Sequence, residues 1–287
     1  MATSKNSYQG RLALVTGGGS GIGLALAQLL AREGANVWLL GRRKAVLEPA
    51  LQTLSNAIGQ KHGIIAADVS DWKQVQAAVE KLKKQAGLPD LLLNFAGVTY
   101  AGYLSEIPVE KFHELTNINY LGQLHMVKAL LPAMLERGSG YIVNMSSAAG
   151  FVTGPGYGAY SPTKYAIRGF SDVLRAEVKP RGLKVSVVFP PDTDTYHVAY
   201  EKSLRTPELQ YLSDEAGIGP FKFGLLSTDF VASAIFRGMQ RGDYIILPGR
   251  GNYVMYHLIR LLGNIVYPMT DDQWAEARRK TSKGPKG

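Results

Sequence analysis

Apolar runs alternate with amphipathic stretches along the chain from residue 11 onward. Short runs that are apolar throughout predict strands whose two faces are both covered. These runs are residues 12–16, 36–40, 63–67, 91–94, 140–145, 184–189 and 244–247. Helical patterns lie between them, for example at residues 21–32, 72–85, 109–136 and 158–179. Strand–helix alternation with right-handed crossovers predicts an α/β fold, a Rossmann-like doubly wound parallel sheet in a single domain.

Two regions interrupt this alternation. Residues 192–226 contain Pro207 and Pro220 and show no clear strand pattern. A segment of this length directly after a strand is typical of a substrate lid, which we place at residues 196–226. The second region is a C-terminal extension, residues 250–287. Residues 10–195 are then expected to form the cofactor-binding and catalytic core of one domain spanning residues 1–287.

The chain has 287 residues, which suits one large α/β domain or two small ones, and 46% of them are hydrophobic, enough for a sizeable core. It contains no cysteine, which excludes disulfides, thiolate metal sites and cysteine nucleophiles. The five histidines are scattered without the spacing of metal ligands, so no metal site is expected.

The formal net charge is +9, and it is spread along the sequence. No basic stripe with interleaved aromatic residues is present, which argues against a nucleic-acid partner. The N-terminus lacks the apolar segment of a signal peptide, and no apolar run is long enough to span a bilayer, so a cytoplasmic protein is expected. Basic residues gather near the C-terminus, as a solubilising tail or as an attraction to an anionic membrane on its cytosolic face. They are Arg278, Arg279, Lys280, Lys283 and Lys286.

The first predicted strand ends in a glycine-rich turn that leads into a helical pattern. Glycines let the backbone turn tightly and approach a pyrophosphate, and the helix N-terminus offers unpaired N–H groups to that anion. Such a turn alone is a weak signal, but its place between the first strand and the first helix favours a dinucleotide site. The residues expected to contact the cofactor here are Gly17, Gly19, Ser20, Gly21, Ile22 and Gly23.

Arg42 and Arg43 follow the second predicted strand, where an NAD-selective site usually has an acidic residue. A guanidinium fits a 2′-phosphate through paired hydrogen bonds, so the sequence predicts NADP(H) as cofactor. Arginines that only face solvent are the other interpretation. Further contacts are expected where the next two strands end: Asp68 and Val69 beside the adenine, and Asn94, Ala96 and Gly97 near the adenine ribose.

Tyr160 and Lys164 stand four residues apart on a predicted helix, which puts both on one face. An ammonium near a phenol stabilises the phenolate, so we expect Lys164 to lower the pKa of Tyr160 and let it exchange a proton with a substrate oxygen. The pair lies downstream of Ser147, at the end of a predicted strand. Ser147 is expected to position the substrate oxygen, with Ser146 as the neighbouring alternative.

Asn119 lies in the long helical pattern between the fourth and fifth strands. Its side chain is expected to hold a water that links Lys164 to solvent. The alternative is that Asn119 only satisfies backbone groups inside its own helix. These four residues, Ser147, Tyr160, Lys164 and Asn119, are the candidate catalytic set.

Together these motifs resemble the short-chain dehydrogenase/reductase family: the T-G-x-x-x-G-x-G turn, N-x-A-G, and the serine, tyrosine, lysine and helical asparagine. The resemblance covers about residues 10–195. It implies a Rossmann-like fold, a Ser–Tyr–Lys–Asn tetrad and a homodimer or homotetramer. The usual N-N-A-G is changed here, because Phe95 stands in the second position.

A narrower resemblance lies in residues 189–195, Phe-Pro-Pro-Asp-Thr-Asp-Thr, which look like the 3-ketodihydrosphingosine reductases, NADPH-dependent enzymes of sphingolipid synthesis. That group implies reduction of 3-ketosphinganine, a long-chain amino-ketone lipid. By the same resemblance Pro190, Thr193 and Thr195 contact the cofactor, and Thr195 holds the nicotinamide carboxamide. Two departures are Tyr196-His197, where the group often has Pro-Gly, and the lack of the N-terminal membrane segment frequent in eukaryotic members.

Other functions remain open on the sequence alone. A reductase of another apolar ketone, such as a 3-ketoacyl or steroid compound, would share every catalytic residue. An NADP(H)-binding regulatory protein without turnover would tend to lose Tyr160 or Lys164, and both are present. The apolar and aromatic stretch at residues 253–267 is too interrupted to span a membrane. It is expected to lie in the membrane interface, or else to pack over the substrate pocket or another subunit.

Overall fold

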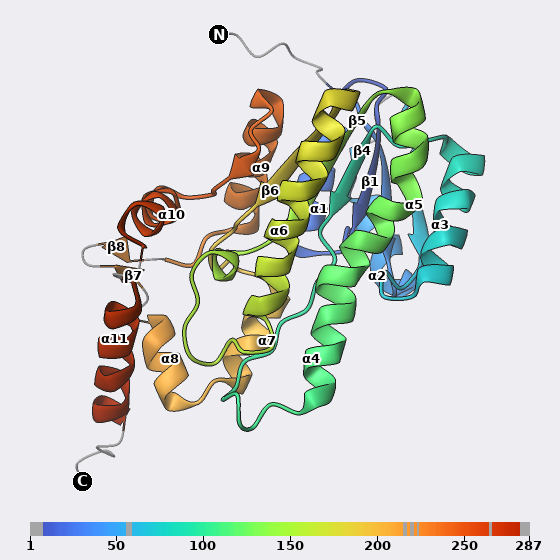
Figure 1. Ribbon diagram of the computed structural model, residues 1–287. Coiled ribbons are helices and arrows are strands. Elements are labelled where there is room, and N and C mark those ends of the chain that lie inside the picture. The colour runs from blue at the N-terminus through green and yellow to red at the C-terminus, as the bar shows by residue number, and fades with distance from the viewer. Residues whose placement is uncertain are drawn as a thin grey trace.

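The computed structural model describes residues 8–55, 59–214, 217–218, 221–222, 224–263 and 266–281. A seven-stranded sheet with the order β3-β2-β1-β4-β5-β6-β9 forms its centre, and every neighbouring pair in it is parallel (Figure 1). The strands are β1 (Leu12–Thr16), β2 (Asn36–Gly41), β3 (Gly63–Ala66), β4 (Leu91–Asn94), β5 (Gly140–Met145), β6 (Leu183–Val188) and β9 (Ile245–Ile246). The predicted doubly wound parallel sheet is therefore confirmed.

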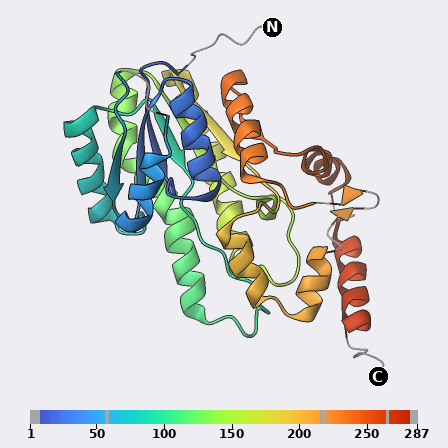
Figure 2. The same cartoon turned by 180° about the vertical axis from the view of Figure 1, so that it is seen from behind.

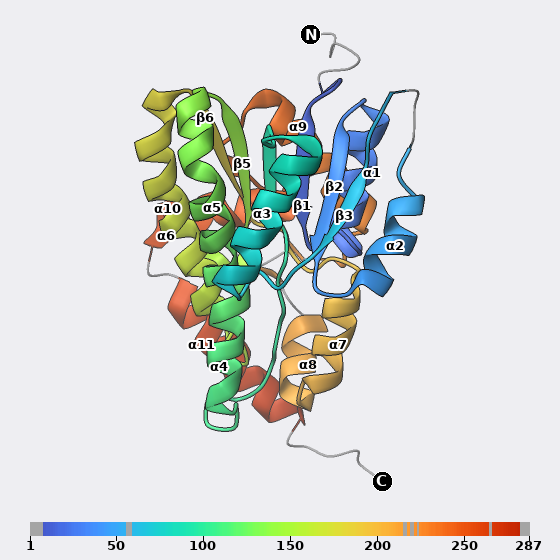
Figure 3. The same ribbon diagram turned by 90° about the vertical axis from the view of Figure 1, so that its right-hand side faces the viewer.

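Helices cover both faces of the sheet and bury its apolar side chains in two separate cores (Figures 2 and 3). One face carries α1 (Gly21–Arg32), α2 (Lys44–Gln52) and α9 (Thr228–Arg241). The other carries α3 (Trp72–Ala86), α5 (Gly122–Arg137) and α6 (Ser161–Val178). Because both faces are covered, the strands are mostly apolar, as β4 shows with three buried leucines before the buried Asn94.

The predicted strands agree with the observed ones to within one or two residues at their ends, and the main difference is in the long helical pattern at residues 109–136. The structure divides it into α4 (Val109–Leu115), a π-helical segment (Thr116–Leu121) and α5. Apolar periodicity continues across the break, which is why the sequence predicted one helix. The wider turn brings Asn119 inward, where its side chain is fully buried.

The predicted lid contains helices. After β6 the chain forms α7 (Tyr196–Leu204) and α8 (Pro207–Asp214), followed by the two-residue strands β7 (Gly217–Ile218) and β8 (Phe221–Lys222). These last two pair antiparallel, where the sequence had shown no clear strand. Figure 1 shows α7 and α8 beyond the carboxyl edge of the main sheet, on the same side as α4.

The C-terminal extension forms α10 (Arg250–Leu262) and α11 (Val266–Thr281). The inner face of α10 places Met255 and Tyr256 in a third apolar cluster with Phe151 and Phe189. α11 packs against α8, where the Tyr103 and Trp274 rings also meet at 5.9 Å. The extension therefore covers both the core and the lid, while Ile265, Lys283 and Lys286 lie outside the described residues.

Within the described ranges, none of the helices has the length and apolar character needed to cross a bilayer.

Candidate active site

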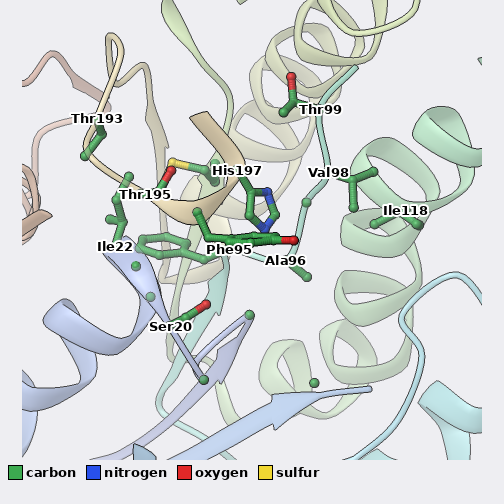
Figure 4. Close-up of a pocket in the computed structure, with 18 of the residues that line it drawn as sticks. Ser20, Ile22, Phe95, Ala96, Val98, Thr99, Ile118, Thr193, Thr195 and His197 are labelled. Carbon is green, nitrogen blue, oxygen red and sulfur yellow. The ribbon is translucent and has the colours of Figure 1, made fainter. Parts of the chain in front are cut away.

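A pocket opens at the carboxyl edge of the sheet, where parallel α/β folds bind their ligands. Its walls come from the turn between β1 and α1, the ends of β2 to β6, and the helices α6 and α7. Figure 4 shows part of this lining, with Ser20 and Ile22 from the glycine turn and Thr195 and His197 from the segment after β6. Every residue predicted to contact the cofactor lines this pocket except Asn94.

The glycine turn is held by close backbone packing that larger residues would prevent. Gly17 has a φ of +66°, and a Cβ there would lie 2.7 Å from the carbonyl oxygen of Phe95. A Cβ on Gly23 would lie 2.5 Å from the carbonyl oxygen of Gly17. Ser20 stands at the N-cap of α1 without a side-chain cap hydrogen bond, so the first N–H groups of α1 remain available to a ligand. The turn fits a pyrophosphate.

Arg42 and Arg43 stand between β2 and α2, and both line the pocket. The Arg42 side chain is 55% exposed, and its Nη1 lies 3.8 Å from Oδ2 of Asp68. An exposed pair at this distance is weak, so the guanidinium is free to turn towards a phosphate. The placement suits a 2′-phosphate at the ribose end of a dinucleotide.

The end of β4 differs from the prediction for Asn94. Its side chain is fully buried in the core and donates a 3.0 Å hydrogen bond to Oδ1 of Asn144. Asn94 therefore links β4 to β5 inside the sheet and does not line the pocket. Phe95, Ala96 and Gly97 line it instead, so the structure brings two of the three predicted residues of this segment to the pocket.

Tyr160 and Lys164 lie at the start of α6, with Tyr160 in the N-cap position. The Lys164 ammonium nitrogen lies 5.3 Å from the centre of the Tyr160 ring and donates a 3.3 Å hydrogen bond to the carbonyl oxygen of Met145. Lys164 is only 4% exposed. The helical spacing therefore brings the two side chains together at the pocket, as predicted.

Burial controls the protonation of both groups. Burial raises the pKa of Tyr160 above its ordinary value, and a hydrogen bond with Ser147 offsets only part of this effect. Burial also lowers the pKa of Lys164 to about 7. The net shift in the pKa of Tyr160 is therefore opposite to the expected lowering, because burial outweighs the effects that favour the phenolate. Tyr160 carries its proton at neutral pH, which suits a proton donor.

The two serines at the end of β5 have different surroundings. The Ser146 hydroxyl is buried and donates a 2.8 Å hydrogen bond to the carbonyl oxygen of Lys164. It fixes α6 to the end of β5. The Ser147 hydroxyl accepts a 3.2 Å hydrogen bond from the Ala149 N–H and also bonds with Tyr160. Ser147 is thus the serine that lies beside the Tyr160 hydroxyl, where both groups can contact a substrate.

Asn119 bonds outside its own helix. Its Oδ1 accepts a 2.8 Å hydrogen bond from the Val98 N–H, and its amide nitrogen donates to the Val98 carbonyl oxygen and to Thr163 Oγ1. A Cβ on Gly97 would lie 3.2 Å from Asn119 Oδ1 and 3.7 Å from the Lys164 ammonium. Asn119 therefore holds the loop after β4 beside Lys164, and the water link between the two remains a prediction.

The segment after β6 returns over the glycine turn. Thr193 is buried, and its hydroxyl donates a 2.8 Å hydrogen bond to the Pro191 carbonyl oxygen. Thr195 accepts a hydrogen bond from the Val198 N–H and so caps α7. A Cβ on Gly21 would lie 3.3 Å from the Thr195 methyl carbon. This proximity places Thr195 within reach of the nicotinamide end of a dinucleotide that follows the turn.

Several lining residues were not predicted from the sequence. His197, on α7, lines the pocket. Asp192 and Glu201 line it as well. Asp192 directly follows the prolines after β6, so its position at a strand end was a usable signal. Thr99 and Glu201 are far apart in the sequence, and only the folded lid brings them together.

Comparisons with known proteins match this architecture. The family model described as "short chain dehydrogenase" matches residues 11–205. A 3-dehydrosphinganine reductase of Danio rerio is 32% identical over 246 residues, covering 84% of this chain and 72% of that protein. A 3-ketodihydrosphingosine reductase of Mus musculus is 34% identical over 249 residues, covering 85% of this chain and 73% of that protein.

Among solved structures, a short chain dehydrogenase/reductase from Burkholderia phymatum in complex with NAD superposes with a TM-score of 0.76. It is 26% identical, and the match covers 90% of this chain and 96% of that one. The match thus extends beyond residues 11–205 into the C-terminal part of the chain.

Proposed function

The chain belongs to the short-chain dehydrogenase/reductase family, and from that membership we propose that it reduces the C3 ketone of 3-ketosphinganine to sphinganine with NADPH. The observation that carries the proposal is the grouping of Ser147, Tyr160 and Lys164 at the end of a pocket that begins at the glycine turn. The choice of substrate rests on the relatives from Danio rerio and Mus musculus, whose names state that reaction and whose similarity covers 84% and 85% of the chain.

The chain's own residues supply binding, orientation and a proton. The glycine turn and the N-terminus of α1 hold the pyrophosphate, and Thr195 orients the nicotinamide. When bound, the cofactor supplies the hydride that reduces the carbonyl carbon. Ser147 donates a hydrogen bond to the ketone oxygen and fixes its position next to the Tyr160 hydroxyl.

Tyr160 donates its proton to the ketone oxygen as that oxygen gains negative charge. Its raised pKa keeps the proton on the phenol until the substrate oxygen becomes basic enough to accept it. Lys164 lies beside the ring and offers positive charge when it is protonated, which favours the phenolate left behind. A proton from solvent then restores the Tyr160 hydroxyl. We propose that this proton enters on the side of the pocket where Asn119 lies.

We further propose that the cofactor is NADP(H). Arg42 and Arg43 both line the pocket at its ribose end, and the Arg42 guanidinium has only a weak, exposed partner in Asp68. A 2′-phosphate would give it a charge-assisted partner, which a ribose hydroxyl does not.

We also propose that the protein works at an anionic membrane surface, since a sphingoid ketone partitions into lipid. Only the inner face of α10 is buried in the core. Its outer side chains, Tyr253 and Leu261, are 56% and 81% exposed, and Tyr267 of α11 is 67% exposed. Aromatic and aliphatic side chains of this kind insert at headgroup depth, and Arg278 and its basic neighbours add attraction to anionic lipid.

The reaction is tested by following the transferred atom. Purified protein is mixed with 3-ketosphinganine and NADPH that carries deuterium at the transferred C4 position of the nicotinamide. We expect sphinganine with one deuterium on C3 in mass spectra, and none in a mixture without protein. Absence of labelled sphinganine, with the protein folded and NADPH bound, would contradict the proposed function.

A further inference from the structure

Polar contacts connect α7 to the loop after β4 and to the segment just before α6. Glu201 on α7 is 5% exposed, and its Oε2 accepts a 2.6 Å hydrogen bond from the Thr99 hydroxyl. Its Oε1 accepts a 2.8 Å hydrogen bond from the Tyr157 hydroxyl and a 2.7 Å hydrogen bond from Arg205 Nη2. The Tyr157 ring in turn lies 6.3 Å from the ring of Tyr160. The polar group therefore lies next to the ring of the catalytic tyrosine.

Asp192 is the second carboxylate of this group, and it is less well paired. Its Oδ2 lies 3.6 Å from Arg205 Nη2, while Glu201 Oε1 lies 2.7 Å from the same nitrogen. The Asp192 side chain is 47% exposed and lines the pocket, whereas the Arg205 side chain is 1% exposed. Arg205 is thus committed mainly to Glu201, and Asp192 presents its carboxylate to the pocket.

The charges of the group do not cancel. Two carboxylates share one buried guanidinium, which leaves one negative charge on the side that Asp192 occupies. Loss of water around the carboxyl group and then the charge of Glu201 raise the pKa of Asp192, while Arg205 and Lys202 lower it. A cation bound in the pocket would supply the missing partner.

We propose that Asp192, set in place by Arg205 and Glu201, binds the ammonium group next to the ketone of the substrate and so selects amino ketones over plain ketones. The inference rests on the proposed function, because 3-ketosphinganine carries its amino group on the carbon adjacent to the reacting carbonyl. Asp192 follows the strand β6 and precedes Thr193 and Thr195, so it lies on the segment that borders the nicotinamide end of the pocket.

The backbone at Asp192 is anchored from outside the pocket. The Leu226 N–H donates a 3.0 Å hydrogen bond to the Asp192 carbonyl oxygen, and the Asp194 N–H donates a 2.8 Å hydrogen bond to the Leu226 carbonyl oxygen. The carboxylate is thus presented by a fixed segment. Asp194 belongs to the same segment and carries the same charge, but it is exposed and does not line the pocket, which makes it a matched control.

The test compares two substrates that differ only in the amino group: 3-ketosphinganine and 1-hydroxyoctadecan-3-one. The quantity measured is the ratio of their kcat/KM values with NADPH. We expect the wild-type protein to favour the amino ketone at least about tenfold. Asp192→Asn should reduce that ratio about tenfold or more, Asp192→Glu should retain part of it, and Asp194→Asn should leave it unchanged.

The outcomes separate the inference from the function on which it rests. If the wild-type protein reduces both ketones equally well, or if Asp192→Asn keeps the wild-type ratio, the role of Asp192 is refuted while ketosphinganine reduction stands. If the wild-type protein does not reduce 3-ketosphinganine, the function itself fails, and the inference fails with it. Should Asp192→Asn not fold, as judged by circular dichroism and NADPH binding, the wild-type ratio alone decides.

Discussion

The ammonium nitrogen of Lys164 lies 5.3 Å from the centre of the Tyr160 ring, and both side chains line one pocket, with Lys164 buried and Tyr160 partly buried. Burial disfavours the charged form of each group, so Tyr160 keeps its proton and Lys164 loses its proton more readily than an exposed lysine. Both effects prepare the site for proton transfer during reduction of a ketone. They also make specific predictions about activity and stability.

The first prediction concerns the proton donor. Tyr160→Phe removes the hydroxyl and keeps the ring that packs beside Tyr157 and Lys164. The rate of ketone reduction should fall by about 10² or more, which is the usual size of an acid–base contribution. NADPH affinity, measured by fluorescence titration, should change little. Turnover close to wild type in a folded variant would refute the assignment of Tyr160.

The second prediction concerns the stability cost of burying Lys164. Its pKa falls from 10.5 to about 7 on folding, so between these values the unfolded chain binds a proton that the folded chain does not. The free energy of unfolding should therefore rise with pH in that window, by up to about 1.4 kcal/mol per pH unit from this one group. Below about pH 7 both states are protonated, and this slope disappears.

The effect of Lys164 on this slope is measured by denaturing the wild-type protein and Lys164→Met between pH 7.5 and 9. Tyr160 remains protonated over that range. For Lys164→Met, the free energy of unfolding should lack the part of the pH slope that comes from Lys164. The gain in stability over the wild type should therefore be largest at the lower pH. Lys81→Met removes an exposed lysine from α3 and should leave the slope as in the wild type. Equal slopes for the wild type and Lys164→Met would show that burial does not perturb Lys164.

The third prediction concerns cofactor choice. Wild-type protein should bind NADPH at least tenfold more tightly than NADH, about 1.4 kcal/mol. Replacing Arg42 and Arg43 together by Ala should remove most of this preference by weakening NADPH alone. Lys44→Ala is the control, because Lys44 follows directly but does not line the pocket. A wild-type protein that binds NADH as tightly as NADPH would overturn the proposal.

The fourth prediction concerns the outer face of α10. Leu261 is 81% exposed, so replacing it by Ser should not disturb the core. Burying a leucine side chain contributes about 1.5–3 kcal/mol, so Leu261→Ser should weaken binding to anionic vesicles roughly tenfold in a flotation assay. Val109→Ser changes a 60% exposed side chain at the start of α4 and should float like the wild type. If the intact protein does not float at low salt, the outer face of α10 contacts something other than lipid.

Local patterns were enough to predict much of this molecule. The apolar runs located the strands of the main sheet, and the glycine turn, Tyr160 and Lys164 were identified because their spacing has a direct meaning in strand–turn–helix and helical geometry. Ser146 and Ser147 could not be separated with the same certainty. Both line the pocket, and only the structure shows that the Ser146 hydroxyl is bonded to the α6 backbone whereas Ser147 bonds with Tyr160.

Features that depend on distant contacts were not predictable in this way. The π-helical segment at Asn119 continues the apolar pattern of its neighbours, so nothing local indicated that Asn119 turns inward. Asn94 lies in a recognisable motif, but its hydrogen bond to Asn144 joins β4 to β5 and cannot be inferred from the motif. The contact between Thr99 and Glu201 joins residues 102 positions apart and exists only because α7 folds back over the end of β4.

A comparison of kcat/KM values between ketones decides whether this pocket reduces 3-ketosphinganine with NADPH. The protein is assayed under identical conditions with 3-ketosphinganine, a 3-ketoacyl thioester and a steroid ketone, following NADPH consumption. We expect kcat/KM for 3-ketosphinganine to exceed that for either other ketone by tenfold or more. An equal or higher value for the ketoacyl or steroid compound, or NADPH binding without turnover of any of them, would contradict it.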